Sequence, residues 1–317
     1  MKKRSIIAAA VALVLVLSLT VLAVSARPLW LGFKPNIEAQ AAVLMEMETG
    51  QVKIRLNADT PLPPASLTKL MTEMVILDQI SAGRAGWNEQ VAVSAYASSV
   101  GGTTLSLKRG ELYTVRELFD GIAIYAANDA AVALAEHIAG SESAFVRLMN
   151  EKARSLGLSA ATVFHNASGL MQNDLGPNRP ADLGREETVM TAMDTAKLAR
   201  ALISAHPELL DTVSRTQMEL KGKGLYVSNT NLMLPAMGGS YAYEGTDGLR
   251  TAYNSRIGYS FTGTAKRNGH RMIAVVIGSP TGEARFSSAA RMFDYGFLQH
   301  LPAGRRMLRM AEMMAGR

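Results

Sequence analysis

Ser66 and Lys69 lie three residues apart in the stretch PPASLTKLMTEMVIL, at the start of a segment that is almost entirely apolar. The two prolines before Ala65 cannot continue a helix backward, so we expect a helix to begin near Ser66, with both side chains on one face. Apolar surroundings disfavour the charged form of a lysine, and a neutral Lys69 can accept the proton of the Ser66 hydroxyl. The two residues are therefore a candidate nucleophile and general base.

The same spacing also occurs on ordinary helix surfaces, where the serine caps the helix and the lysine extends into water. Further elements are needed to separate the two interpretations. In penicillin-binding proteins and serine β-lactamases, Ser-x-x-Lys is followed by a Ser-x-Asn element and then by Lys-Thr-Gly. Here the corresponding stretches are YAANDAAVALAEHIAG, which begins at Tyr125, and GTDGLRTAYNSRIGYSFTGTAKRNG, which begins at Gly245.

Over residues 41–297 the chain resembles low-molecular-weight penicillin-binding proteins of the serine-type D-alanyl-D-alanine carboxypeptidase family. Other stretches match this family in the same order: AAVLMEMETGQV, NADTPLPPASLTKLMT, GGTTLSLKRGELYTV, FVRLMNEKARSLGL, NASGL and FDYGF. The resemblance implies an α/β (α+β) fold of the β-lactamase/transpeptidase type. In this fold an antiparallel sheet is flanked by helices and carries an inserted all-helical lobe.

The pattern of residues predicts the same layout independently. Residues 41–56 are expected to form two strands that turn at Glu48-Thr49-Gly50, and residues 257–278 two strands around Asn268-Gly269, a strong hairpin signal. Periodic segments with helix stop signals predict a helical middle, at residues 114–125, 128–139, 143–156 and 191–205. Strands at both ends of the chain would then share one sheet, and we expect a cleft between the sheet and the helices.

The resemblance also implies roles for individual residues. Ser66 is similar to the nucleophile that becomes acylated, and Lys69 to its general base. Asn128 corresponds to the polar residue that holds the substrate amide and the lysine. The backbone amides of Ser66 and Tyr253 correspond to the oxyanion hole, and Arg250 and Thr251 to the groups that bind the terminal carboxylate of the substrate.

Three positions depart from the family's motifs. Ala126 replaces the serine of the second element, which removes a hydroxyl that would pass a proton toward the leaving amine. Arg250 replaces the lysine of the third element: a guanidinium can bind a carboxylate bidentately, but its pKa above ~12 prevents proton delivery at neutral pH. Ala252 replaces the glycine, and its methyl group could obstruct a substrate lying against the strand.

The leading hypothesis is an exported enzyme that removes the terminal D-alanine of peptidoglycan stem peptides through an acyl-serine intermediate. The alternative is a weakly active or inactive homologue that binds muropeptides or cell-wall partners. A β-lactamase is disfavoured, because residues 152–173 contain no Asp or Glu that could deacylate the enzyme. We therefore expect β-lactam antibiotics to act as covalent inhibitors.

Composition restricts cofactors and partners. The 317 residues include no cysteine, and the five histidines are scattered without metal-ligand spacing, so we expect neither a cofactor nor a metal. The formal net charge is +6, of which Lys2, Lys3 and Arg4 contribute three, with no acidic residue in positions 1–26. The remaining +3 is too mild to predict a nucleic-acid partner.

The chain is expected to divide into three parts. Residues 1–26 read as a signal peptide or an uncleaved membrane anchor, with a basic flank before an uncharged run. Residues 27–300 would form the catalytic domain, with the helical lobe at about 66–225, and residues 301–317 a basic amphipathic tail without a C-terminal β domain. The protein would act outside the cytoplasm, at the outer face of the cytoplasmic membrane or in the cell wall, with membrane association through either end.

Overall fold

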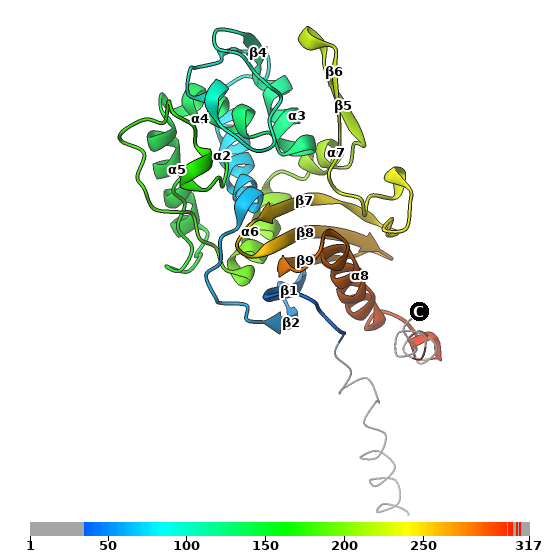
Figure 1. Ribbon diagram of the computed structural model, residues 1–317. Helices are drawn as coiled ribbons and strands as arrows, with labels where there is room; N and C mark the ends of the chain where they lie inside the picture. Colours follow the sequence, from blue (N-terminus) through cyan, green and yellow to red (C-terminus); the bar gives the residue numbers. More distant parts are fainter. Residues whose placement is uncertain (1–34, 303, 307–308, 310, 312–317) are drawn as a thin grey trace, which may run out of the picture. The chain divides into compact units, whose positions relative to one another are not determined.

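The computed structural model describes residues 35–302, 304–306, 309 and 311 (Figure 1). The expected signal segment at 1–26 lies outside these residues, and the tail at 301–317 is described only in part. In the part of the chain that the structure describes, no helix has both the length and the apolar character needed to cross a membrane. Residues 36–302 belong to one unit, which contains every element below.

A five-stranded antiparallel sheet is built from both ends of this unit, with strand order β2-β1-β9-β8-β7. Its strands are β1 (Ala41–Glu46), β2 (Val52–Leu56), β7 (Thr246–Asn254), β8 (Gly258–Arg267) and β9 (His270–Ser279). β1 pairs with β9 over its whole length, which joins segments more than 200 residues apart in sequence. The prediction of one antiparallel sheet from the two ends is confirmed, and β7 lies at its open edge.

Turn residues set the register of both hairpins. Asn268 and Gly269, between β8 and β9, have φ of 49° and 83°. Two positive φ values in a two-residue loop match the twist of the flanking strands, which is why Asn-Gly is favoured there. Gly50 supplies the positive φ (71°) before β2, as its place in the sequence predicted.

Seven α-helices and several short elements complete the described unit. The α-helices are α2 (Lys69–Ser81), α3 (Val115–Tyr125), α4 (Asn128–Ala139), α5 (Glu142–Ser155), α6 (Ala192–Ala205), α7 (Leu209–Val213) and α8 (Gly282–Leu298). The short strands are β3 (Gln90–Ala92), β4 (Leu112–Thr114), β5 (Gln217–Leu220) and β6 (Leu225–Ser228). The 3₁₀ turns are η2 (Ala65–Thr68), η3 (Ala97–Ser99), η4 (Gln172–Asp174), η5 (Lys221–Lys223) and η6 (Pro235–Met237).

The four helices predicted in the middle of the chain agree with the structure to within one residue at each end, whereas the helix expected near Ser66 begins at Lys69, after the turn η2. The cap of α3 shows why: Thr114 accepts from the backbone N–H of Glu117, whose side chain in turn accepts from the Thr114 backbone. The segment at about 66–225, expected to be all-helical, also contains the hairpins β3–β4 and β5–β6. Strands of three or four residues are too short to give a periodic signal in the sequence.

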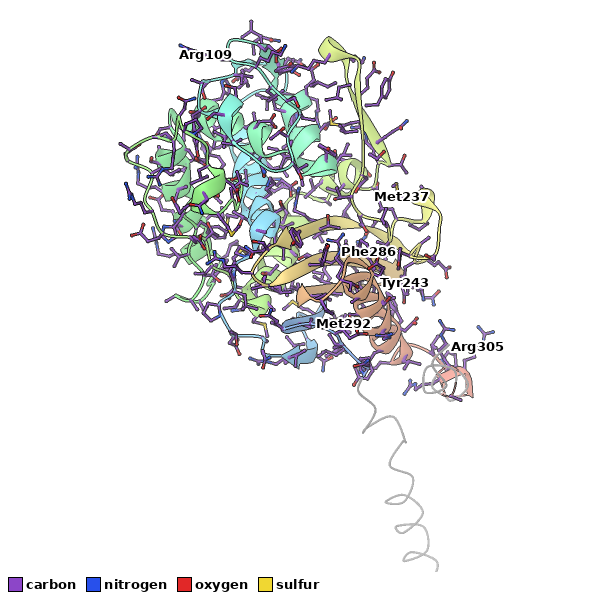
Figure 2. The ribbon with its side chains drawn as sticks, viewed as in Figure 1. Arg109, Met237, Tyr243, Phe286, Met292 and Arg305 are labelled. Carbon is purple, nitrogen blue, oxygen red and sulfur yellow. The ribbon has the colours of Figure 1, made fainter. Side chains whose placement is uncertain are left out.

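Both faces of the sheet are buried, because residues 41–45 of β1 and 272–277 of β9 are apolar without interruption. Val43 and Val275 lie in the apolar cluster that includes α2, α4 and α6, whereas Leu44 and Val276 lie in the cluster that includes α8. This is the two-residue alternation of a strand covered on both sides. α8 covers one face with Phe286 and Met292 among its buried residues (Figure 2), and α6 packs against β1 and β9 on the other.

Phe293 of α8 tests this packing, because its side chain is fully buried against the sheet. Phe293→Ala should lower the free energy of unfolding by about 3–5 kcal/mol, through lost burial and the cavity left behind. Urea denaturation of the purified protein measures it. Tyr226→Ala, at a side chain that is 64% exposed, is the control and should change stability by less than about 0.5 kcal/mol. Equal effects of the two substitutions would contradict the assignment of α8 to the core.

Candidate active site

Ser66 lies in the 3₁₀ turn η2, immediately before α2 begins at Lys69. The residue before it, Ala65, has φ of 47°, a left-handed conformation that costs a non-glycine residue roughly 1–3 kcal/mol. Gly169, with φ of 78°, lies against this turn, and a Cβ at this glycine would collide with the Ala65 carbonyl oxygen. Only glycine therefore allows the loop around residue 169 to lie against the turn that carries Ser66.

Lys69 is completely buried and its Nζ contacts three oxygens. Nζ lies 2.6 Å from Oδ1 of Asn128, 2.7 Å from the carbonyl oxygen of Ser168 and 3.2 Å from Oγ of Ser66. The two carbonyl oxygens can only accept hydrogen bonds, so they use two N–H groups of the amine. A neutral amine then has its lone pair left for the third partner, the Ser66 hydroxyl.

The surroundings favour that neutral form. Burial lowers the pKa of Lys69 well below its ordinary value, and the positive charge of Arg250 lowers it further. Glu73 and Asp129 act in the opposite direction on this pKa. The interpretation that apolar surroundings disfavour a charged Lys69 is thus supported by the geometry of the site.

Asn128 is the first residue of α4, and both polar atoms of its side-chain amide form hydrogen bonds. Its Nδ2 donates to the carbonyl oxygen of Gly101 at 2.8 Å, which leaves Oδ1 to accept from Lys69. The next residue, Asp129, accepts from the backbone N–H groups of Leu105 and Leu107, both at 3.1 Å. These bonds fix the 101–107 loop against the start of α4 and set the orientation of the Asn128 amide.

The structure does not bring Arg250 to the place where the motif predicted it. Its guanidinium is 2% exposed, forms an ion pair with Glu73 of α2 and donates through Nη1 to the carbonyl oxygen of Ile122 at 2.9 Å. Among the described residues that line the cavity beside Ser66, Arg250 is absent. Its side chain lies instead against α2, where an acidic partner is available.

Glu73 is the partner that the sequence analysis missed. It lies one helical turn after Lys69, is 1% exposed, and its Oε2 has no hydrogen-bond partner among the described residues. Burial raises the pKa of Glu73, while the charge of Arg250 opposes this rise. The available signal was an acidic residue within the largely apolar segment 70–77, which is unusual unless a cation pairs with it.

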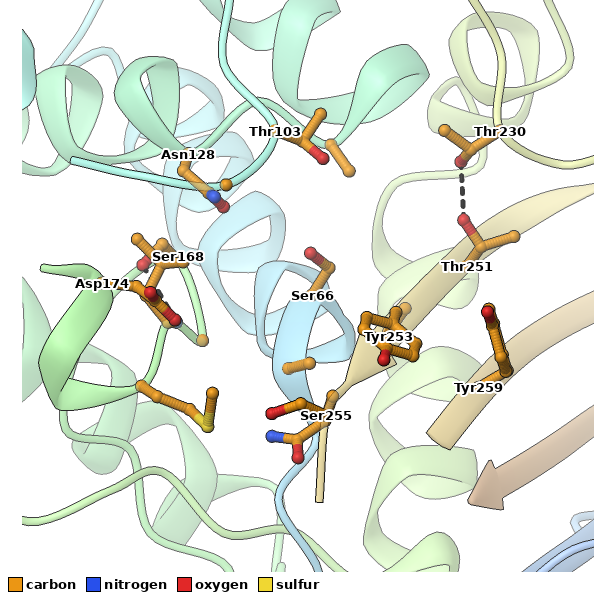
Figure 3. Close-up of a pocket in the computed structure, with 18 of the residues that line it drawn as sticks. Ser66, Thr103, Asn128, Ser168, Asp174, Thr230, Thr251, Tyr253, Ser255 and Tyr259 are labelled. Atoms are coloured by element: carbon orange, nitrogen blue, oxygen red, sulfur yellow. Dashed lines mark hydrogen bonds between the residues drawn. The ribbon is translucent and has the colours of Figure 1, made fainter. Parts of the chain in front are cut away.

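A cavity of about 540 Å³ opens beside Ser66, between the helices and the edge strand β7 (Figure 3). Thr251 and Tyr253 line it from β7, as predicted, and Ala252 lies between them. Thr251 Oγ1 donates to Oγ1 of Thr230 at 2.7 Å, and Thr230 is a lining residue that the sequence analysis did not identify. The expected cleft between the sheet and the helices is therefore present.

Ala126 also lines the cavity, at the turn between α3 and α4, where its φ is 65°. The position matches the serine of the family's second element, and its methyl group carries no donor or acceptor. A proton that passes toward the leaving amine must therefore travel through the hydroxyl of another residue or through water. Ser168, which also lines the cavity, presents a hydroxyl that is 3.1 Å from Oδ1 of Asn166.

Arg285, near the start of α8, contributes a cation to the cavity. Its Nη1 donates to the carbonyl oxygen of Ala252 at 3.1 Å, and its Nε has no partner among the described residues. Burial lowers the pKa of Arg285 to about 10, so the guanidinium stays charged at neutral pH. Arg285 could not be predicted from the sequence, because nothing in its local pattern shows that α8 begins at the cavity.

Comparisons with known proteins agree with this arrangement. The family model described as D-alanyl-D-alanine carboxypeptidase matches residues 31–281. The chain is 36% identical over 265 residues to D-alanyl-D-alanine carboxypeptidase DacF of Bacillus subtilis, covering 83% of this chain and 63% of the relative. It is 31% identical to DacC of Escherichia coli, with 83% and 62% covered. The chain thus spans slightly less than two thirds of these relatives.

Solved structures give the same result. Penicillin-binding protein D2 of Listeria monocytogenes, in its cefotaxime-bound form, superposes with a TM-score of 0.72 at 33% identity, covering 83% of this chain and all of that one. Penicillin-binding protein 6B of Escherichia coli gives 0.73 at 32% identity, with 85% and 80% covered. The mixed α/β fold with an antiparallel sheet, the Ser-x-x-Lys geometry and these matches together lead to one conclusion. The chain belongs to the D-alanyl-D-alanine carboxypeptidase family.

Proposed function

We propose that the protein is a serine-type D-alanyl-D-alanine carboxypeptidase, which removes the terminal D-alanine of peptidoglycan stem peptides. The observation that carries this proposal is the buried Lys69 amine, bonded to two carbonyl oxygens and 3.2 Å from Oγ of Ser66. A serine hydroxyl is a weak nucleophile unless a base accepts its proton. Lys69 is proposed as that base, because burial lowers its pKa well below the ordinary value of a lysine.

In the proposed reaction, Ser66 Oγ attacks the carbonyl carbon between the two D-alanines while its proton passes to Lys69. The C–N bond then breaks, the D-alanine amine leaves with a proton, and the acyl-Ser66 ester is hydrolysed by water, which restores the hydroxyl. The backbone N–H groups of Ser66 and Tyr253 stabilise the oxyanion, as the family resemblance implies. Fixed donors of this kind need no reorganisation during the reaction.

Thr251 and Arg285 are proposed to bind the terminal carboxylate of the stem peptide. Both line the cavity, and a guanidinium bonds strongly to a carboxylate. Arg250, for which the motif predicted this role, is instead proposed to hold Glu73 and to keep a positive charge near Lys69. In this arrangement, the positive charge that binds the carboxylate comes from Arg285 of α8, and the positive charge near Lys69 comes from Arg250 of β7. The motif assigns both charges to the same residue of β7.

The substrate sets the remaining assignments, which follow from the family and stay proposals for this chain. Peptidoglycan stem peptides occur outside the cytoplasm, so the protein is proposed to act there, with residues 27–300 as the catalytic domain. Export would use residues 1–26, and membrane contact would use that segment or the tail at 301–317. Because a relative was solved with cefotaxime bound, β-lactams are proposed to acylate Ser66.

A second candidate function is a weakly active homologue that binds muropeptides or cell-wall partners. Ala126 favours it, because this position in the cavity offers no hydroxyl to pass a proton to the leaving amine. In that case the protein would bind a pentapeptide but release D-alanine slowly or not at all. The following measurement distinguishes the two functions.

Ser66→Ala should lower the rate of D-alanine release from a stem pentapeptide at least about 10³-fold, because no other group replaces the nucleophile. Chromatographic detection of free D-alanine measures it, with Ser155→Ala, at an exposed serine of α5, as the control. Release that survives Ser66→Ala would refute the nucleophile assignment. Pentapeptide binding without release by the unmodified protein would favour the second function.

The pH dependence of kcat/KM tests the base. A protonated Lys69 cannot accept a proton, so kcat/KM should fall as pH decreases through the pKa of Lys69. Because burial lowers this pKa well below 10.5, the profile should reach its plateau far below pH 10.5. A kcat/KM that keeps rising up to pH 10.5 would show that a lysine with an ordinary pKa acts as the base.

The ion pair between Arg250 and Glu73 predicts a coupled effect on stability. Arg250→Met alone should cost about 3–5 kcal/mol of unfolding free energy, because Glu73 is left buried without its partner. Adding Glu73→Leu should recover most of this loss, since both charges are then removed. Urea denaturation of the two variants measures the difference. Additive losses would contradict a direct pairing.

The same double variant separates the roles of the two arginines. Arg285→Gln should raise KM for the pentapeptide about tenfold or more, the effect of losing a charged hydrogen bond. The Arg250→Met/Glu73→Leu variant, if folded, should leave KM within about threefold of the original value. A large rise of KM in the double variant, with little change in Arg285→Gln, would show that Arg250 and not Arg285 binds the terminal carboxylate.

A further inference from the structure

Three side chains that could bind a metal meet at the end of the sheet. Glu46 is the last residue of β1, His270 is the first residue of β9, and His300 follows the end of α8. Oε1 of Glu46 lies 3.0 Å from Nε2 of His300 and 3.9 Å from Nδ1 of His270. The three candidate ligand atoms lie within 4.8 Å of one another.

The carboxylate is oriented by its neighbours so that one oxygen faces the imidazoles. The Glu46 side chain is 7% exposed, and its Oε2 accepts from the hydroxyl of Thr49 at 2.7 Å. A second group that holds one oxygen and leaves the other for an ion is the usual arrangement around a metal-binding carboxylate.

Lys53 is the charge that opposes a cation here. Its Nζ lies 3.7 Å from Oε2 of Glu46, the oxygen that the hydroxyl of Thr49 already contacts. The ammonium also donates to side-chain oxygens of Gln51 at 2.5 Å and of Gln299 at 2.8 Å. It is therefore held on the Oε2 side of the carboxylate and does not occupy the space between Oε1 and the two rings.

The ligand set selects the kind of metal. Two imidazole nitrogens and one carboxylate oxygen suit Zn²⁺, whereas Ca²⁺ and Mg²⁺ prefer oxygen ligands alone. In a tetrahedral zinc site, ligand atoms at about 2.0–2.2 Å from the metal lie about 3.3–3.6 Å from one another. The atoms of Glu46 and His300 are already near this separation. The remaining pairs need to close by about 1.5 Å or less, which rotation of the partly exposed His270 ring allows.

We propose that Glu46, His270 and His300 bind one Zn²⁺ ion, with water as the fourth ligand. The side chains of His270 and His300 are 42% and 21% exposed, which gives the ion and the water access from solvent. The two rings, now stacked with centroids 3.6 Å apart, turn apart to direct both nitrogens at the metal. The sequence showed no metal-ligand spacing because each ligand comes from a different element.

The site lies far from the cavity. β9 runs from His270 to Ser279, which pairs with the cavity residue Tyr259. Nine steps along a strand correspond to about 30 Å, so the metal takes no part in the reaction proposed above. It ties the end of α8 to β1 and β9, and α8 carries Arg285 at its other end. The inference therefore does not depend on the proposed activity.

Calorimetric titration of Zn²⁺ into the metal-free full chain, purified in detergent, tests the proposal. We expect saturable binding of one ion per chain, weakened at least about tenfold by His270→Ala and by His300→Ala. His137→Ala is the matched control, because Nε2 of this histidine also contacts a glutamate, Glu89, at 2.9 Å, and its affinity should equal that of the unchanged protein. The zinc-induced rise of Tm should disappear in the two ligand variants.

A measurement on the unchanged protein tests the proposal even if the variants do not fold. X-ray absorption at the zinc edge should show two imidazoles among the nearest neighbours of the bound ion. The absence of saturable binding would overturn the proposal. So would affinity that is equal in His270→Ala, His300→Ala and the control, or a bound zinc with fewer than two imidazoles.

Discussion

The buried amine of Lys69 is the interaction on which the rest of the site depends. A lysine with no exposure to water can stay in the fold only if it is neutral or fully paired, because burial of an isolated charge is too costly. Here Asn128 and the Ser168 carbonyl take its two N–H groups and Ser66 faces the remaining position. Burial thus favours the neutral amine, and its hydrogen bonds direct it at the Ser66 hydroxyl.

Several segments that are distant in the sequence position the hydrogen-bond partners of the Lys69 amine. Gly169 lets the loop that carries the Ser168 carbonyl lie against the turn of Ser66. The start of α4 and the 101–107 loop orient the amide of Asn128. The site is therefore supported by elements on every side of α2, which keeps its geometry fixed before a substrate arrives.

The changed third motif is best understood together with α2. Arg250 and Glu73 are both almost fully buried and pair with each other, and their charges act on Lys69 in opposite directions. Removal of one partner alone would leave a buried charge, so the two residues depend on each other. The positive group in the cavity comes instead from Arg285 on α8. The positive charge of the third motif is thus paired with Glu73 of α2, and a different positive charge, on α8, faces the cavity.

Much of the fold could be predicted because its signals are local. Asn268-Gly269 fixes a hairpin through backbone preference, and the cap at Thr114 fixes a helix start. Ser66, Lys69 and Asn128 were found because they belong to spaced motifs. Glu73, Thr230 and Arg285 were not found, because their relevance depends on which elements pack together. The direction of the Arg250 side chain depends on the face of β7 that meets α2, which no motif specifies.

Intact-mass spectrometry after incubation with benzylpenicillin tests the central claim, that Lys69 makes Ser66 a nucleophile in spite of the altered motifs. We predict one covalent adduct per chain, located on Ser66 by peptide mapping and stable for the duration of the experiment. A protein shown to be folded that forms no adduct, or forms it elsewhere than Ser66, would contradict the account.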